Sequence, residues 1–313
     1  MRRANYIRNY RSFSRSAKWA TVIITIIFSF LSGSVAFATI AQRDGATTGT
    51  TTSTSLPIAK PTGVLAGDVM IVNIAKVGNN TTAPSLSGWT LIDGRSLAGG
   101  TLRYAAVLYR VADGTEGSSF TFALGSGTNG AVGSIVAFSG VNTSGATPFD
   151  VTPGTISVQA SQTGVVAASI TTASANAAVI MFGEAAASSP TFSGWTTTSP
   201  GALAELYDNR VGTTASVGAA WAIKATAGST GAGAATLNGA ERNGGILIAL
   251  KPALSIGRKG QTIVARLNLD GKTMPPRRYG LPVGDGELTK GTEYFQQRLI
   301  NEWWPRIVLK GDG

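Results

Sequence analysis

Short apolar runs separated by turn residues dominate the chain between residues 47 and 253. Residues 69–74 are almost continuously apolar, which predicts a strand buried on both faces. Residues 119–124 alternate strictly between polar and apolar types, which predicts a half-buried strand. Similar runs predict an edge strand over 47–58 and further strands over 102–111 and 133–138. No segment from 44 to 253 shows a sustained helical period, so the pattern predicts an all-β fold.

The order of these parts recurs further along the chain. Pro84 stands five residues before Trp89, and Pro190 stands five before Trp195, an offset of 106. An apolar strand precedes each Trp motif, and an aromatic strand and a closing strand follow it. The closing strands are offset by 112, as a loop insertion would produce. We therefore predict a duplication with halves over about 64–141 and 172–252. The alternative is independent use of Gly-Trp corners in one all-β protein.

Neither group of strands could bury both of its faces alone. We therefore expect a jelly-roll-like β-sandwich built from two similar halves over 39–253. The alternative is two tandem Ig-like sandwiches. A short, basic C-terminal extension over 254–313 should follow, with one helix over 293–304 that Thr292 caps and Pro305 ends.

The amino-terminal segment has the order of a secretory signal peptide. Six cations precede an apolar run over 20–31, and small residues follow. Ala36 and Ala38 occupy the positions that a signal peptidase reads, so we expect cleavage before Thr39, with cleavage after Ala41 as second choice. The alternative is an uncleaved anchor, because the uncharged stretch over 19–42 is long enough to span a bilayer. Both interpretations predict a secreted or cell-surface protein that contacts the membrane only through this segment.

The composition removes several classes of chemistry. The 313 residues include no His and no Cys, which excludes a Ser-His-Asp triad, a thiolate nucleophile, zinc sites with His or Cys ligands, and disulfides. No cofactor and no metal ion is expected. Residues 125–130 match the dinucleotide pattern G-x-G-x-x-G, but a strand follows where that pattern requires a helix. A chain of this length can bury a sizeable core without disulfides.

The net charge of +10 does not belong to the predicted sandwich. Residues 39–253 carry ten cations and ten acids, whereas residues 254–313 carry ten cations and six acids. No nucleic-acid partner is therefore expected. Within the extension, Arg277 and Arg278 are candidate anchors for anionic wall polymer or lipid, and Trp303 and Trp304 belong to a helix that could dock on a partner. The alternative is a solvated linker.

Four aromatic residues are candidates for ligand binding. Trp89, Trp195, Tyr104 and Tyr109 could present ring faces to sugars, as aromatic residues do in many glycan-binding modules. The alternative is core packing, because each of them belongs to an apolar strand or its corner.

Three acidic residues are candidates for catalysis. Glu184, Glu205 and Asp208 are the acids of the predicted sandwich that turns explain least. A glycosidase needs two carboxylates about 5 to 10 Å apart. Spacing along the sequence does not bring these three together, so we do not expect an enzyme.

Five structural motifs stand out along the predicted sandwich. They are Gly67-Asp68 before an apolar strand, Pro84 followed by Gly88-Trp89-Thr90-Leu91, Tyr109-Arg110-Val111-Ala112, Ala137-Phe138-Ser139-Gly140-Val141, and Ala249-Leu250-Lys251-Pro252. Together they resemble a loosely defined class of Gly/Ala/Thr-rich β-sandwich modules of bacterial secreted and surface proteins and of phage tail-associated proteins. The resemblance covers residues 47–253. It implies a fold and an extracellular setting, and it implies no activity or site residue.

These observations lead to three hypotheses about function. The first is an exported, non-catalytic binding or adhesion module, with glycans or cell-envelope polymers as candidate partners. The second is a structural subunit of a surface layer or filament, in which Thr-rich edge strands and the extension self-associate. The third is a carboxylate-dependent glycan hydrolase. The first two are preferred over the third, and neither of the two is clearly preferred to the other.

Overall fold

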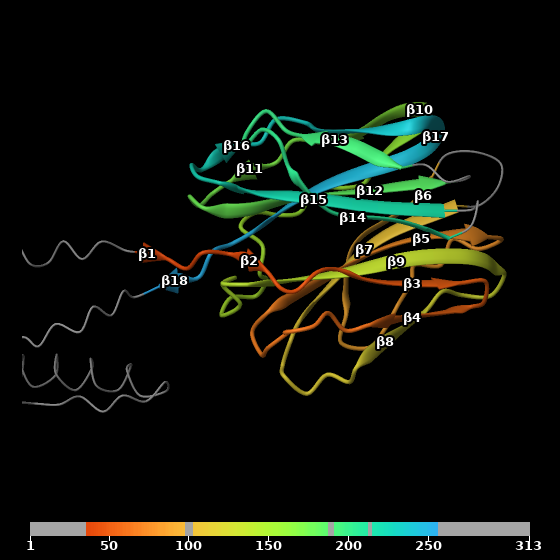
Figure 1. The fold of residues 1–313 in the computed structure, drawn as a ribbon, viewed down its shortest axis with the longest axis horizontal. Coiled ribbons are helices and arrows are strands. Elements are labelled where there is room, and N and C mark those ends of the chain that lie inside the picture. The colour runs from red at the N-terminus through yellow and green to blue at the C-terminus, as the bar shows by residue number, and fades with distance from the viewer. Residues whose placement is uncertain (1–35, 98–102, 187–190, 212–214, 256–313) are drawn as a thin grey trace, which may run out of the picture. The chain divides into compact units, whose positions relative to one another are not determined.

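The computed structural model describes residues 36–97, 103–186, 191–211 and 215–255. These residues all belong to one compact unit. Every regular element of the described residues is a β-strand (Figure 1), so the predicted all-β fold is confirmed. The predicted helix over 293–304 and most of the predicted signal peptide lie outside the described residues.

The first half of the unit forms a large sheet and a small sheet. The large sheet has the order β2-β9-β5-β7-β6, and β3 also pairs with β9. The small sheet pairs β4 with β8. The strands are β2 (Ala41–Gln42), β3 (Thr47–Thr51), β4 (Ser55–Ala59), β5 (Val69–Gly78), β6 (Thr90–Leu97), β7 (Arg103–Val111), β8 (Ser119–Ala123) and β9 (Thr128–Ser139).

The second half repeats this plan. Its large sheet has the order β10-β17-β12-β15-β14, β13 also pairs with β17, and β11 pairs with β16. The strands are β10 (Ser157–Ala167), β11 (Thr171–Thr172), β12 (Ala177–Ala186), β13 (Phe192–Thr196), β14 (Ala204–Val211), β15 (Ala215–Lys224), β16 (Gly228–Ser229) and β17 (Gly233–Leu250). The prediction of a β-sandwich made of two similar halves is thus confirmed.

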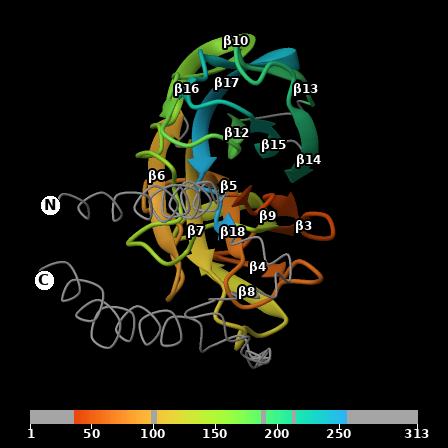
Figure 2. The same ribbon diagram turned by 90° about the vertical axis from the view of Figure 1, so that its left-hand side faces the viewer.

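Three apolar clusters lie between the sheets. The central core joins the two large sheets, with Ile71 and Val107 from the first half and Ile180 and Ile246 from the second. The first outer core lies between the first large sheet and the pair β4 and β8. The second outer core lies beneath β13 and the outer parts of β10 and β17. Figure 2 shows β4 and β8 on one side of the unit and β10 and β13 on the opposite side.

The strands at the centre of each large sheet are buried on both faces. All ten residues of β5 are buried. Because side chains alternate across a strand, Ile71 enters the central core and Val72 enters the first outer core. Likewise Ile180 of β12 enters the central core and Met181 the second outer core. Burial on both faces explains the nearly continuous apolar run predicted at 69–74.

Strand pairing repeats between the halves. Val69, near the start of β5, pairs with Val111 on β7, and Ala178, near the start of β12, pairs with Ile223 on β15. In both halves a β-bulge follows the second paired residue of the next strand, β6 or β14. Bulges are specific structural features, so their shared position supports a common plan for the two halves.

The predicted edge strand over 47–58 is two strands in the structure. β3 pairs with β9 in the large sheet, whereas β4 pairs with β8 in the small sheet. A turn separates them, in which the Ser53 backbone N–H donates to Thr51 Oγ1 at 3.1 Å. A side-chain hydroxyl that accepts a hydrogen bond from a nearby backbone N–H stabilises a turn and competes with strand pairing. This turn explains why the Thr-rich segment leaves the large sheet after β3 and continues in the small sheet as β4.

A stacked aromatic pair in the second outer core requires glycine beneath it. Phe192 and Trp195 stack with ring centroids 5.3 Å apart. A Cβ added to Gly218 would lie 2.8 Å from Trp195 Cζ2, and one added to Gly183 would lie 2.8 Å from Phe192 Cε1. These distances leave no room for a methyl group, so both positions favour glycine.

We expect Gly218→Ala to lower the free energy of unfolding by about 1–3 kcal/mol, because the new methyl group displaces the ring stack. Urea unfolding followed by fluorescence measures this change. Gly239→Ala on β17 is the matched control, since its Cβ would meet nothing within 4 Å. A loss of equal size in both variants would contradict the explanation.

Candidate functional site

The two ends of the described chain meet at one end of the sandwich. β1 (Ala36–Phe37) pairs with β18 (Leu254–Ser255) in an antiparallel ladder. The Ala38 N–H extends this contact by donating to the Ala253 carbonyl oxygen at 2.7 Å. Figure 1 shows the two strands side by side. The segments that precede and follow the sandwich are therefore attached at the same end.

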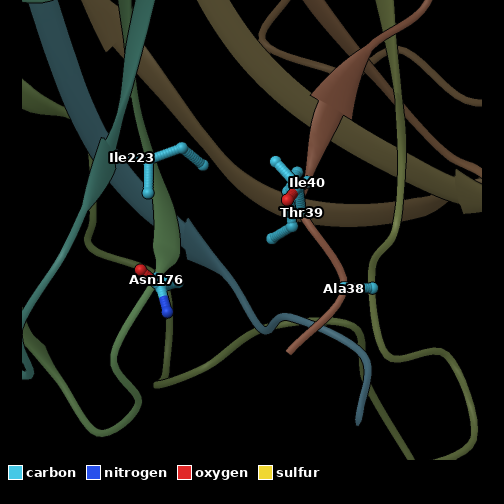
Figure 3. Close-up of a pocket in the computed structure, with 5 residues that line it drawn as sticks. All are labelled: Ala38, Thr39, Ile40, Asn176 and Ile223. Carbon is cyan, nitrogen blue, oxygen red and sulfur yellow. The ribbon is translucent and has the colours of Figure 1, made fainter. Parts of the chain in front are cut away.

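Two small pockets flank this meeting point. The first, shown in Figure 3, has a volume of about 160 Å³ and is lined by Ala38, Thr39, Ile40, Asn176 and Ile223. The second has a volume of about 320 Å³ and is lined by Val141, Asn142, Thr143, Ser144, Ala253 and Leu254. Ordinary small-molecule pockets start at about 300 Å³, so only the second reaches that range. Beside it, Leu254 is an exposed apolar side chain, with an exposed fraction of 62%.

The two candidate tryptophans fill separate outer cores. Trp89 has an exposed fraction of 8%, and its ring packs edge-on against Phe120 and Phe122 at 5.1 Å each. Trp195 has an exposed fraction of 5% and stacks on Phe192. The faces of both rings are therefore turned toward the interior.

The two candidate tyrosines are half-buried and lie on opposite faces of the first large sheet. Tyr104 packs against the first outer core, and burial together with the charge of Asp93 raises its pKa. Tyr109 packs against the central core, edge-on to Phe149 at 4.9 Å. The structure thus distributes the four aromatic candidates among three cores and does not bring them together on one surface.

The three acidic candidates lie on opposite faces of the second large sheet. Glu205 is exposed and accepts a hydrogen bond from Trp195 Nε1 at 3.2 Å. Asp208 accepts one from the Phe192 N–H at 2.8 Å, and burial raises its pKa. Both acids thus accept hydrogen bonds from the stacked pair of Phe192 and Trp195. Glu184 points the other way, next to Phe182 in the central core, and is fully buried.

Glu184 is in an environment that disfavours its charged form. Its exposed fraction is 0%. Desolvation, with a smaller effect from the negative charge of Asp93, raises the pKa of Glu184 well above its usual value. Burial therefore favours the protonated, neutral form of this side chain.

Several polar side chains link the two halves across the central core, and the sequence analysis did not select them as site residues. Asn73 Nδ2 donates to the carbonyl oxygens of Gly183 at 3.1 Å and Gly218 at 3.4 Å. Asn209 Nδ2 donates to Ser134 Oγ at 3.1 Å. The sequence signal was available, because Asn73 is the single polar residue of the apolar run over 69–74. A polar residue in such a run indicates a specific buried partner.

A buried lysine, Lys76, binds two loops at one end of the first half. Lys76 has an exposed fraction of 2%. Its ammonium group donates to Asn80 Oδ1. It also donates to the carbonyl oxygens of Thr82 and Leu124, at 2.5 Å in each case. Burial lowers the pKa of Lys76 to about 8. Three acceptors satisfy the three donors of an ammonium group, so Lys76 ties together the loops at 80–82 and 124.

The candidate anchoring residues of the C-terminal extension lie outside the described residues. They are Arg277, Arg278, Trp303 and Trp304. Among the residues that the structure describes, no three acidic, His or Cys side chains are grouped as a metal site would need. The same part of the chain contains no helix of the length and apolarity that a bilayer crossing requires.

Comparison with known proteins gave no relative. No family model, no curated protein and no solved structure matches this chain. The function must therefore be argued from the residues and their arrangement.

We expect Asn73→Ala to lower the free energy of unfolding by about 2–3 kcal/mol, because it removes two hydrogen bonds between the halves and leaves a cavity. Chemical denaturation measures the change. Asn129→Ala, at an exposed position of β9, is the control and should change stability by less than about 0.5 kcal/mol. Equal effects would show that Asn73 does not join the halves.

Proposed function

We propose that this chain is an exported, non-catalytic module that is attached to the cell envelope at one end and binds partners through its free surfaces. The pairing of β1 with β18 is the observation that carries the proposal. If the N-terminal segment stays as an anchor, it holds the sandwich at this end. If it is cleaved before Thr39, β1 is removed with it, and the C-terminal extension alone leaves from the end where β18 lies. Both routes attach the sandwich at one place.

The position of the chain ends limits how copies of the chain could be linked. In the uncleaved chain, a pull between the segments before β1 and after β18 would act on a two-residue ladder and would peel its hydrogen bonds one at a time. The sandwich itself would lie outside the path of that load. The arrangement therefore favours a pendant module over a filament whose subunits are joined through their chain ends. Self-association through edge strands is the form of the second hypothesis that the sizing experiment tests.

The arrangement of acids supports a non-catalytic role. Two carboxylates of a glycosidase must face one substrate. Here Glu205 and Asp208 hold Trp195 and Phe192, while Glu184 lies in the central core on the other face of the sheet. Glycans or envelope polymers remain the proposed partners, since a neutral surface rich in Ser, Thr and Asn can donate and accept hydrogen bonds to sugar hydroxyls.

Amino-terminal sequencing of the mature protein should give Thr39 as the first residue if the leader is removed. Ile40 has an exposed fraction of 1% and belongs to the central core. Cleavage before Thr39 keeps this side chain, whereas cleavage after Ala41 deletes it, at a cost of about 2–5 kcal/mol. A mature protein that begins at Gln42 and is as stable as one beginning at Thr39 would contradict this assignment.

The attachment itself can be tested with single cysteines, because the chain has none of its own. β9 runs from Thr128 to Ser139, about 40 Å at ~3.3 Å per residue, and its last residue pairs with Ala41 near the chain ends. Exposed Ser126 precedes its far end, and exposed Ala146 lies in the loop that follows its near end. The two sites thus report the free and the attached ends.

On intact cells, we expect a bulky, membrane-impermeant maleimide to label Ser126→Cys at least about fivefold faster than Ala146→Cys, while both react equally in the purified protein. Equal labelling on cells would contradict attachment at one end, and no labelling of either variant would contradict export to the surface. Sizing of residues 39–255 gives a separate control, since assembly into large oligomers would favour the structural-subunit hypothesis. Glycan binding by the monomer would support adhesion.

A further inference from the structure

The carboxyl group of Glu184 is a buried ionisable group of the central core. Glu184 is fully buried, and neither of its carboxyl oxygens has a hydrogen-bond partner among the described residues. A Cβ placed on Gly244 would lie 3.5 Å from Glu184 Oε2, 3.1 Å from Leu97 Cδ2 and 2.6 Å from Ile156 Cγ2. The carboxyl group therefore lies near Leu97 and Ile156, where β6 of the first half meets β10 and β17 of the second, and its charge also acts on the buried hydroxyl of Tyr207. We call this contact, made by Leu97, Ile156, Glu184 and Gly244, the seam.

The charges around the seam do not supply a counter-ion that lowers the cost of ionisation. Titratable groups occur at positions around the seam on four neighbouring strands, namely Asp93 and Arg95 on β6, Arg103 on β7, Tyr207 on β14 and Arg242 on β17. Asp93 is the charge that acts on Glu184, and it is repulsive. Its Oδ2 atom is engaged by Arg95 Nε at 3.1 Å and by the Ile156 N–H at 2.7 Å. That last hydrogen bond crosses the seam.

The seam lies between the two halves, and each half has an outer core of its own. The first half retains its outer core around Val72 and Phe122, and the second retains its own around Met181 and Trp195. β6 lies at the edge of its sheet, so its contact with β10 and β17 is at the rim of the central core. A local opening at this rim would hydrate Glu184 and leave both outer cores in place.

We propose that the seam is a proton-controlled joint, which stays closed while Glu184 is protonated and opens locally when that proton is lost. A buried carboxyl is tolerated as a neutral acid, whereas an unpaired carboxylate in the same place is strongly disfavoured. Water that enters an open seam solvates the carboxylate. Loss of the proton therefore shifts the equilibrium toward the open form.

The direction of the pH effect follows from linkage. The closed form holds its proton to a higher pH than the open form, where Glu184 has its ordinary pKa of about 4.3. Between these two pKa values the open form binds fewer protons, so its population rises up to about tenfold per pH unit. Above the raised pKa of the closed form, the population becomes constant. The joint is thus tighter in mild acid than in alkali.

Two neighbouring alanines on β7 provide a matched pair of probes. Ala105 lies in the central core, opposite Arg95 on β6, and Ala106 lies in the first outer core. Both are fully buried. In the Cys-free chain, a thiol at position 105 reports opening at the seam, whereas a thiol at position 106 reports unfolding of the first half.

The experiment measures labelling rates of Ala105→Cys and Ala106→Cys with a small disulfide reagent from about pH 5 to about pH 9, corrected for thiolate concentration with the exposed Ser126→Cys variant. We expect Ala105→Cys to react at least about tenfold faster than Ala106→Cys, with a rate that rises up to about tenfold per pH unit. Adding Glu184→Gln, which is isosteric and cannot ionise, should abolish the rise.

Equal rates at the two positions would overturn the proposal, because they would show that labelling requires unfolding. A rise with pH that persists in the Glu184→Gln background would overturn it as well. Hydrogen exchange of the Ile156 amide, with intrinsic exchange corrected for pH, gives an independent test in the unsubstituted chain. Protection that falls with pH in the natural sequence and not in Glu184→Gln supports the joint, and protection with the same pH dependence in both overturns it.

Discussion

The face-to-face burial of two large sheets is the constraint on which the rest of this structure depends. Each large sheet also carries a small sheet or a folded ribbon on its outer face, so the central strands have no solvent-facing side. All ten residues of β5 are buried for this reason. Burial on both faces supplies an apolar contact large enough to make disulfides unnecessary. It also means that any polar side chain on these strands needs a partner or must be neutral.

The buried polar residues show three solutions to that requirement. Asn73 reaches across the central core to two carbonyl oxygens of the other half. Lys76 keeps an ammonium group by meeting three oxygen acceptors at the end of the first half. Glu184 has no such partner among the described residues, and burial raises its pKa, which favours the neutral acid. The first two stabilise one arrangement of the strands, whereas the third makes that arrangement sensitive to protons.

The path of the chain connects the fold to the proposed role. The described chain enters at β1 and leaves at β18, which pair with each other. A module attached in this way presents its remaining faces and its far loops to the surroundings. Among the described residues, neither of the two pockets near the chain ends is lined by an acid, and the aromatic candidates pack in the cores. The proposed role therefore relies on exposed loops and strand surfaces.

The sequence by itself determined the fold class, the repetition of two halves and the burial of β5, because apolar period and turn residues are local properties that a strand must satisfy wherever it lies. It also indicated Asn73 as an exception within an apolar run. Only the tertiary structure decided that Glu184 faces the central core while Glu205 and Asp208 hold an aromatic stack. Which face of a strand meets which sheet depends on register and on the partner layer, and neither is encoded in spacing along the chain.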